Sequence, residues 1–240
     1  MTSSLAEYYQ SLGFPASKWH VGAEHPRLEQ YAIRLLQTLP GARVLEIGYQ
    51  AGGFAVPVIR AMQGRRDFGY LGVDSLNYGN AVRGDVIAAY LQSHGIASGF
   101  QFVETDAYEF LAQSQHGRFD LILIDHYKPL YPRDLLAVVR AGLVSPQGVI
   151  LLHDILGRAR AVASLCEAIA RAYGYTWMVT NEVPEGLAVL RHGGGVDQER
   201  PGLWERLRRG IVRIFVGIQR LACLANDALR GIKRRLIRSC

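Results

Sequence analysis

The stretch Val44-Leu-Glu-Ile-Gly-Tyr-Gln-Ala-Gly-Gly53 joins the end of an apolar run to a glycine-rich turn. We predict a buried strand at 43–47 before this turn and a helix at 54–62 after it. Further apolar runs alternate with helix-like stretches, and they predict strands at 69–73, 100–103, 119–124 and 148–152 and helices at 81–94, 108–115, 133–142 and 159–173. Such alternation is typical of a parallel sheet covered on both faces. The sequence therefore predicts an α/β fold with a doubly wound, mostly parallel sheet.

The regions on either side of this core complete the predicted organisation. Residues 175–180 and 186–190 are two more candidate strands, close enough in sequence to be antiparallel. Gly193-Gly-Gly195 breaks the alternating pattern and begins a linker. We therefore expect an N-terminal helical segment at 1–40, a central domain at 41–192, and a linker with a helical tail at 193–240.

Composition excludes several classes of protein. The 240 residues are 49% hydrophobic and 20% charged, so the chain can bury a sizeable core and is not expected to be disordered. Three cysteines cannot build a disulfide framework, which favours a reducing compartment. No signal peptide is visible at the N-terminus, and no uncharged apolar run reaches the roughly 18 residues of a spanning helix. We expect a cytoplasmic protein.

The C-terminal tail concentrates the basic residues. Residues 199–240 carry eleven Lys and Arg against three acidic residues, and the net charge of the whole chain is +6. Apolar residues recur there every three or four positions, which predicts an amphipathic helix with a basic face. Residues 203–238 could bind an anionic membrane surface peripherally, or pair in a homodimer as a coiled coil. Nucleic acid is not the expected partner, because the aromatic interleaving typical of single-strand binders is missing.

The glycine turn is the first candidate site. Ligands of open α/β sheets bind beyond the carboxyl ends of the strands, where glycines let the backbone approach them. Gly48 and Gly52 supply such a turn, and Glu46 offers a carboxylate beside it. The spacing differs from the dinucleotide motif G-x-G-x-x-G, because Gln50 stands where the second glycine belongs. A tight strand-to-helix turn without a ligand is the alternative.

Two acidic residues follow the next strands. Asp74 ends the second strand, and a carboxylate there can accept hydrogen bonds from both ribose hydroxyls of a nucleoside. Asp106 follows the third strand, where it could accept from the amino group of an adenine or cap the next helix. Together they suggest a nucleoside-containing ligand.

Another pair of carboxylates, Asp125 and Asp154, ends the fourth and fifth strands at the same sheet edge. Two hard oxygen ligands suit Mg2+. Near a divalent cation and partly desolvated, Lys128 could lose its proton and act as a base. His126 and His153 are further candidate ligands or bases. The alternative is that the carboxylates cap helices and Lys128 is a solvated loop residue.

These residues carry a resemblance to a known family. Over about residues 25–190 the chain resembles the class I S-adenosylmethionine-dependent methyltransferases, which have a Rossmann-like fold. Asp125-His-Tyr-Lys128 is similar to the Asp-His-Trp-Lys segment of catechol O-methyltransferase and its metal-dependent relatives. The His153-Asp154 pair instead resembles a related bacterial group linked to sugar and natural-product tailoring.

The resemblance implies a role for each candidate residue. It implies that S-adenosyl-L-methionine is held by Glu46, Gly48 and Gly52 at its methionine part, by Asp74 at the ribose, by Asp106 and Ala107 at the adenine, and by His126 and Tyr127 at its flanks. It further implies a divalent metal on Asp125 and Asp154 with Lys128 as general base. The catechol enzymes have an amide ligand after the second carboxylate, where this chain has Ile155, so His153 or a water would complete the site. A histidine ligand would shift the metal preference from Mg2+ toward Mn2+, Fe2+ or Zn2+.

The implied activity is metal-assisted transfer of a methyl group to a hydroxyl of a small molecule or sugar. Two other functions remain open. The chain could be a catalytically degenerate methyltransferase fold that serves as a membrane-tethered scaffold, which Gln50 and Ile155 favour. It could also be an RNA or protein methyltransferase, for which the basic tail is the argument. The Asn-Pro-Pro-Tyr-like signature of amino-group methyltransferases is missing after the fourth strand.

Overall fold

The computed structural model describes residues 4–14, 26–77, 81–113, 116–193 and 210. In chain order the elements are α1 (Leu5–Ser11), α2 (Pro26–Thr38), β1 (Ala42–Ile47), α3 (Ala55–Ala61), β2 (Phe68–Asp74), α4 (Gly84–Ser93), β3 (Phe100–Glu104), α5 (Ala107–Ala112), β4 (Phe119–Ile124), the 3-10 turn η3 (Lys128–Leu130), α6 (Tyr131–Ala141), β5 (Val144–Leu152), α7 (Arg160–Ala172), β6 (Tyr175–Thr180) and β7 (Leu187–His192). The linker and helical tail predicted at 193–240 lie outside the described residues, apart from 193 and 210.

The described strands form one seven-stranded sheet in the order β3-β2-β1-β4-β5-β7-β6. The first five in this order run parallel, whereas β7 is antiparallel to both β5 and β6. The strand order reverses between β1 and β4, and open α/β sheets bind ligands at the carboxyl ends of the strands at such a point. The predicted doubly wound, mostly parallel α/β fold is confirmed, and so is the antiparallel last pair.

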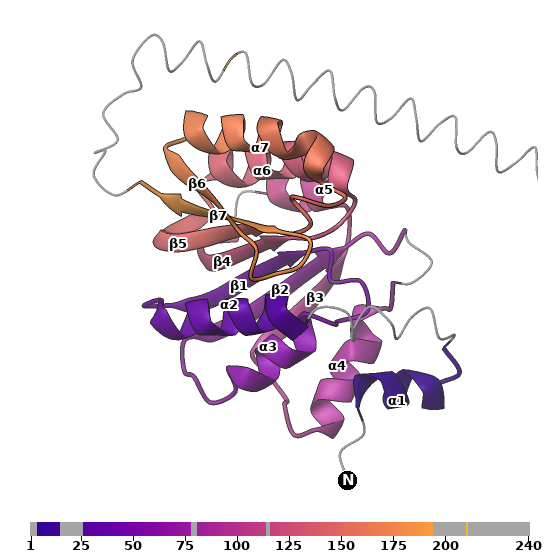
Figure 1. Cartoon of the computed structure of the whole chain (residues 1–240). Helices are drawn as coiled ribbons and strands as arrows, with labels where there is room; N and C mark the ends of the chain where they lie inside the picture. Colours follow the sequence, from indigo (N-terminus) through magenta and orange to yellow (C-terminus); the bar gives the residue numbers. More distant parts are fainter. Residues whose placement is uncertain (1–3, 15–25, 78–80, 114–115, 194–209, 211–240) are drawn as a thin grey trace, which may run out of the picture.

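Helices cover both faces of the sheet (Figure 1): α5, α6 and α7 lie over one face, and α2, α3 and α4 over the other. Two clusters of buried apolar side chains fill these two layers. Leu45 and Ile47 of β1 belong to one cluster and Val44 to the other, because successive side chains of a strand point to opposite faces. Burial on both faces explains why the strands are almost continuously apolar.

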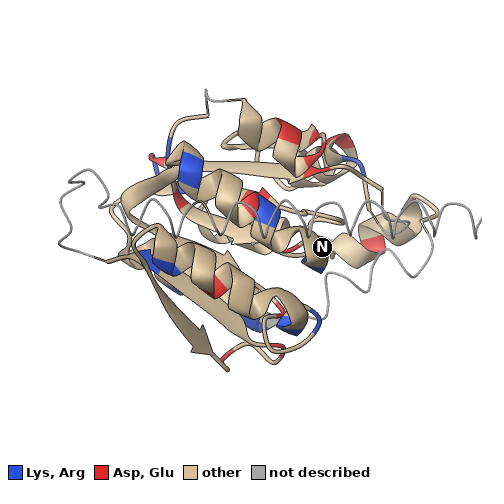
Figure 2. Ribbon diagram, turned by 90° about the horizontal axis from the view of Figure 1, so that it is seen from above, with Lys and Arg blue, Asp and Glu red and all other residues tan. Residues whose placement is uncertain are grey.

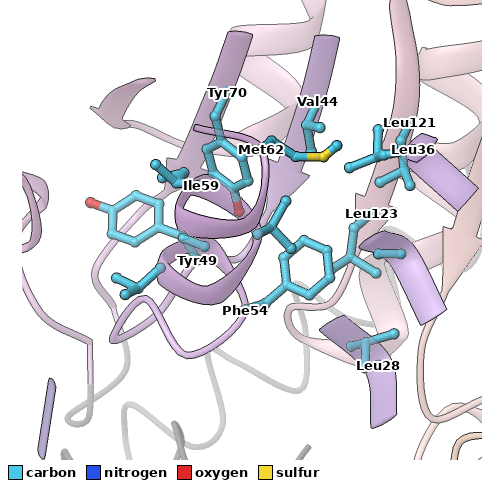
Figure 3. Close-up of a cluster of buried hydrophobic side chains, with 14 of the residues drawn as sticks. Leu28, Leu36, Val44, Tyr49, Phe54, Ile59, Met62, Tyr70, Leu121 and Leu123 are labelled. Carbon is cyan, nitrogen blue, oxygen red and sulfur yellow. The ribbon is translucent and has the colours of Figure 1, made fainter. Parts of the chain in front are cut away.

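The N-terminal helices are part of the second cluster. Leu28 and Leu36 of α2 lie with Phe54 among the buried side chains between the helices and the sheet (Figure 3). Tyr9 of α1 is buried, and its hydroxyl donates a hydrogen bond to the carbonyl of Ala51 at 2.7 Å. These helices therefore support the glycine turn as well as the sheet.

The fifth strand is longer than its apolar run predicts. β5 begins at Val144 rather than Gly148, although Pro146 and Gln147 are exposed. The pairing of β5 with β4 shifts register in this segment, as expected where Pro removes a ladder donor. The polar residues at the irregularity hide the start of the strand from a search for apolar runs.

Helix α6 begins two residues before its predicted start, at Tyr131. Pro132 stands in its first turn, where the missing N–H of proline has no intrahelical partner to lose. The preceding 3-10 turn η3 places Lys128 directly ahead of the helix. This arrangement matters for the site, because it brings Lys128 and Tyr131 together.

Surface charges of both signs are interspersed over the described helices in the view of Figure 2. Exposed ion pairs such as Arg34 with Glu182 and Arg83 with Asp85 are of the kind that contributes little to stability. Among the described residues, the structure has no helix that combines the length and the apolar character needed to cross a membrane.

Candidate active site

The glycine turn after β1 lies against the segment that follows β4. Gly48 has φ of 99°, and a Cβ atom there would stand 2.7 Å from both the carbonyl oxygen of Asp125 and the Cβ of His126. The Gly48 N–H donates to the carbonyl of Val73 at 2.8 Å. Only glycine fits both the backbone angle and the space. The turn therefore joins β1, β2 and β4 at the point where the strand order reverses.

Backbone strain gathers at this edge of the sheet. The non-glycine residues with positive φ in the described part of the chain are Gln50 at 47°, Leu76 at 53° and Asp154 at 60°. They follow the ends of β1, β2 and β5. Residues held in this region cost about 1–3 kcal/mol each and cluster at functional sites. Gln50 thus adopts a positive φ, which is the backbone region that favours glycine.

Asp74 holds two of these strained residues in place. Its carboxylate accepts hydrogen bonds from the backbone N–H of Gln50 at 2.9 Å and of Leu76 at 2.8 Å. Asp74 is buried at the end of β2, as predicted. It ties the turns after β1 and β2 together, and its role in binding a ribose stays a prediction.

Glu46 faces the interior of the protein. The carboxyl group is 2% exposed and accepts a hydrogen bond from the hydroxyl of Tyr70. Burial raises the pKa of Glu46 well above its usual value, and the charges of Asp125 and Asp74 raise it further against the opposing effect of Tyr70. Glu46 is therefore a buried acid beside the turn, and its predicted contact with the methionine part of a cofactor is untested.

We expect Glu46→Gln to stabilise the protein increasingly as pH rises. The pKa of Glu46 is higher in the folded protein than in the unfolded chain. Between these two pKa values the free energy of unfolding of the wild type therefore falls by up to about 1.4 kcal/mol per pH unit as the pH rises. Glutamine removes this loss. Urea unfolding at pH 5 and pH 8, with Glu109→Gln as the exposed control, measures the difference. A gain that is equal at both pH values contradicts the prediction.

Asp106 caps helix α5. Its side chain accepts a hydrogen bond from the Tyr108 N–H at 2.8 Å, and its Oδ1 lies 3.5 Å from the Arg133 guanidinium. The capping interpretation is thus confirmed, whereas the contact of Asp106 and Ala107 with an adenine stays a prediction. Ala107 is the first residue of the helix and packs partly against the core.

His126 is directed toward a buried carboxylate that the sequence does not reveal. Its Nε2 lies 2.8 Å from Oδ2 of Asp134, which is fully buried in α6. Arg133 donates to the same carboxylate through Nε at 2.6 Å and through a terminal nitrogen at 3.1 Å. Tyr127 is half-buried and precedes η3. Asp134 therefore lies beside His126 without a hydrogen bond of good geometry, and the predicted contacts of His126 and Tyr127 with a cofactor are untested.

The predicted charged residues after β4 and β5 meet in one cluster. Lys128 Nζ lies 2.5 Å from Oδ1 of Asp125, 2.9 Å from Oδ2 of Asp154 and 2.9 Å from the hydroxyl of Tyr131. Nδ1 of His153 lies 3.0 Å from Oδ2 of Asp125. His153 is 1% exposed and Asp154 5%. We call these five residues the Asp125–Asp154 cluster.

Charges within the Asp125–Asp154 cluster stabilise one another. Burial alone would raise the pKa of Asp125, but Lys128 and His153 outweigh it and lower that pKa below its usual range. Burial alone would lower the pKa values of Lys128 and His153, but the carboxylates of Asp125 and Asp154 raise both. These contacts oppose the loss of the Lys128 proton on which its predicted role as a base depends.

The geometry can be compared with known families. Residues 45–155 match a family model described as a methyltransferase domain. This part of the chain is therefore similar to a methyltransferase domain. The matched range includes the glycine turn, Asp74, Asp106 and the whole Asp125–Asp154 cluster. No curated protein matches the sequence.

Several solved structures share the fold of this chain. The match to the SAH-bound methyltransferase PaMTH1 of Podospora anserina has a TM-score of 0.57 at 18% identity and covers 80% of this chain and 88% of that one. A candidate O-methyltransferase from Klebsiella pneumoniae gives 0.56 at 20% identity, with 79% and 88% covered. Cofactor-bound Rv0187 from MTB gives 0.53 at 18% identity, with 81% and 100% covered. At these identities the likeness concerns the fold alone.

The three predicted metal ligands come together in the structure. Atoms of Asp125, His153 and Asp154 that could bind a metal lie within 4.8 Å of one another. The Lys128 ammonium, however, already contacts both carboxylates. Ile155 is 1% exposed and offers no oxygen ligand from its side chain. The donor atoms suit a divalent cation, but the arrangement of the cluster does not, because a fixed positive charge stands between the two carboxylates.

A further acidic residue, Glu185, lies near the cluster and was not among the predicted site residues. Oε2 of Glu185 lies 3.8 Å from Nε2 of His153. Glu185 belongs to the segment between β6 and β7. Its backbone carbonyl accepts a hydrogen bond from the N–H of Leu156 at 3.0 Å. The antiparallel return of β7 beside β5 brings this distant segment to the site. No local pattern in the sequence indicates such a contact.

Proposed function

We propose that the protein is an S-adenosylmethionine-dependent O-methyltransferase that acts on a hydroxyl of a small molecule or sugar. One observation carries the proposal: the glycine turn after β1 touches the segment after β4 that bears Asp125 and Lys128. This contact sets a candidate cofactor site beside a candidate acceptor site, as group transfer requires. The methyltransferase match over residues 45–155 supports the same chemistry.

In this proposal the cofactor binds to residues at or after the carboxyl ends of β1, β2 and β3. Asp74 would accept the ribose hydroxyls, since it already lies between the two turns, and Asp106 with Ala107 would flank the adenine. The buried acid Glu46 and the turn at Gly48 and Gly52 would surround the methionine part. The SAH-bound and cofactor-bound structures of similar fold support this choice of cofactor.

The proposed acceptor end uses the Asp125–Asp154 cluster. When S-adenosylmethionine is bound, its sulfonium S–CH3 bond would break as the O–CH3 bond forms, and the hydroxyl proton would pass to the carboxylate of Asp154 rather than to Asp125, whose pKa is lowered by Lys128 and His153. The positive charge of Lys128, whose N–H groups contact Asp125, Asp154 and Tyr131, would stabilise through space the negative charge that develops on the acceptor oxygen. This role replaces the general base implied by the resemblance, because the carboxylates hold the Lys128 proton. Alignment of oxygen and methyl group supplies much of the rate.

Asp74→Asn is expected to weaken S-adenosylmethionine binding by about 10- to 100-fold, or about 1.4–2.8 kcal/mol. Asparagine keeps an oxygen for one backbone N–H but loses an acceptor for the ribose. Calorimetric titration measures the change, and Asp85→Asn on the exposed start of α4 is the matched control. Absence of saturable binding by the wild-type protein at millimolar ligand would favour the non-catalytic scaffold.

The predicted partners of the tail stay proposals. An anionic membrane surface or a second copy of the chain would be bound through residues 203–238, of which the structure describes residue 210. Sedimentation with anionic vesicles, before and after truncation at Gly195, separates membrane attachment from self-association. Weakening of vesicle binding by salt would support the first.

A further inference from the structure

The ammonium group of Lys128 has a full set of hydrogen-bond partners inside the protein. A lysine ammonium has three N–H donors. Lys128 Nζ has three acceptors within 2.9 Å, namely Oδ1 of Asp125, Oδ2 of Asp154 and the hydroxyl of Tyr131. The Tyr131 hydroxyl in turn lies 3.3 Å from Asp125 Oδ1, to which it can donate. The network is therefore closed around the ammonium.

The backbone holds the ammonium in this position. Lys128 begins the 3-10 turn η3, and Pro129 follows it, which restricts the conformation of Lys128. Its side chain returns over Asp125, three residues earlier, and is 14% exposed. The ring of Tyr131, buried at the start of α6, lies 5.2 Å from Nζ. The contacts come from η3, from α6 and from the residues that follow β4 and β5, so the ammonium does not depend on a single element of the fold.

The carboxylates have further partners besides Lys128. Oδ2 of Asp125 faces Nδ1 of His153 at 3.0 Å, and Oδ1 of Asp154 lies 3.8 Å from Nε2 of the same ring. Ile155 offers no side-chain ligand, and its backbone N–H donates to the Gly186 carbonyl at 3.1 Å. A divalent cation between Asp125 and Asp154 would have to displace the ammonium or stand beside it at close range.

We infer that the Lys128 ammonium takes the place of a divalent metal between Asp125 and Asp154, and that the site binds no such metal. The cluster then balances two carboxylates with a cation supplied by the chain. Its consequence for catalysis, methyl transfer independent of divalent metal, rests on the proposed function, whereas the binding statement does not.

Mn2+ is the probe for this inference, because its electron paramagnetic resonance signal reports binding without any turnover and its ligand preferences include oxygen. The full chain is titrated with Mn2+ alone. We expect that the wild type has no Mn2+ site that depends on Asp154, so that wild type and Asp154→Asn give the same titration. In Lys128→Met, a neutral side chain of similar length replaces the ammonium. We expect this variant to bind Mn2+ at least about tenfold more tightly than the wild type does, because the competing positive charge is gone.

Two matched variants locate the new site. Lys128→Arg keeps the positive charge and should gain no Mn2+ binding, while Lys128→Met combined with Asp125→Asn should lose what Lys128→Met gained. Thermal unfolding confirms that each variant is folded. If Lys128→Met does not fold, the wild-type titration still decides. Micromolar Mn2+ binding by the wild type that disappears in Asp154→Asn overturns the inference, and so does a folded Lys128→Met that gains no site.

The failure of this inference can be distinguished from failure of the proposed function. A wild-type protein that binds Mn2+ through Asp154 and also binds S-adenosylmethionine remains a methyltransferase with a metal site. A protein that binds neither Mn2+ nor S-adenosylmethionine would contradict the proposed function. The inference that Lys128 takes the place of the metal would still stand. For an active enzyme, a rate that survives exhaustive chelation supports the inference, and a rate restored only by Mn2+ or Mg2+ overturns it.

Discussion

Replacing Asp134 with alanine is expected to lower the free energy of unfolding by about 3–5 kcal/mol, the cost of breaking a buried charge pair from one side. Asp134 is 0% exposed and accepts two hydrogen bonds from Arg133, whose side chain is 12% exposed. Its Oδ2 also lies 2.8 Å from His126. Without the carboxylate, Arg133 keeps its charge in a poorly hydrated position and His126 loses its charged neighbour.

Urea unfolding of Asp134→Ala against wild type measures this loss. Asp85→Ala is the matched control, because Asp85 also pairs with an arginine two residues away but 62% of its side chain is exposed. The control is expected to change the unfolding midpoint little, since solvent replaces such a pair. If the two variants lose similar stability, the buried Asp134 contacts do not support the fold as argued. Asp134→Asn, which keeps acceptor oxygen but loses charge, should fall between them.

The fold could be predicted because its strands are buried on both faces. Runs such as 119–124 are apolar at every position except Asp120 for that reason, and β4 has the predicted bounds. Boundaries failed where polar residues or proline stand at an element end. Pro146 and Gln147 conceal the first half of β5, and Pro132 lies inside α6 although it resembles a break before the helix.

The part of the candidate site that could be predicted is the set of residues that follow the strand ends. The carboxyl ends of parallel strands share one edge, so Asp74, Asp125 and Asp154 were expected together at that edge. The partners of each charge could not be predicted, because they depend on side-chain directions and on segments far away in sequence. Asp134 and Glu185 carry no local signal, and the closure of the network by Lys128 follows from η3, which the sequence did not indicate.

Gly48→Ala is expected to have the other large effect, a loss of about 2–5 kcal/mol of stability from positive φ and overpacking together. The added Cβ would stand 2.7 Å from the carbonyl oxygen of Asp125. That backbone cannot move away easily, because the Asp125 N–H donates to the carbonyl of Ile47 at 2.9 Å within the sheet. The displaced turn should also lower S-adenosylmethionine affinity by about tenfold or more, or about 1.4 kcal/mol.

Gly64→Ala separates the two causes. Gly64 has a similar φ of 89°, but a Cβ there would meet nothing within 4 Å, so only the cost of the backbone angle, about 1–2 kcal/mol, is expected. Its affinity for S-adenosylmethionine should be unchanged, because Gly64 lies outside the turn. Urea unfolding and calorimetric titration of both variants test the argument. Equal stability losses would mean that the contact of Gly48 with Asp125 is unimportant, and a Gly48→Ala variant with wild-type affinity would remove the turn from the cofactor site.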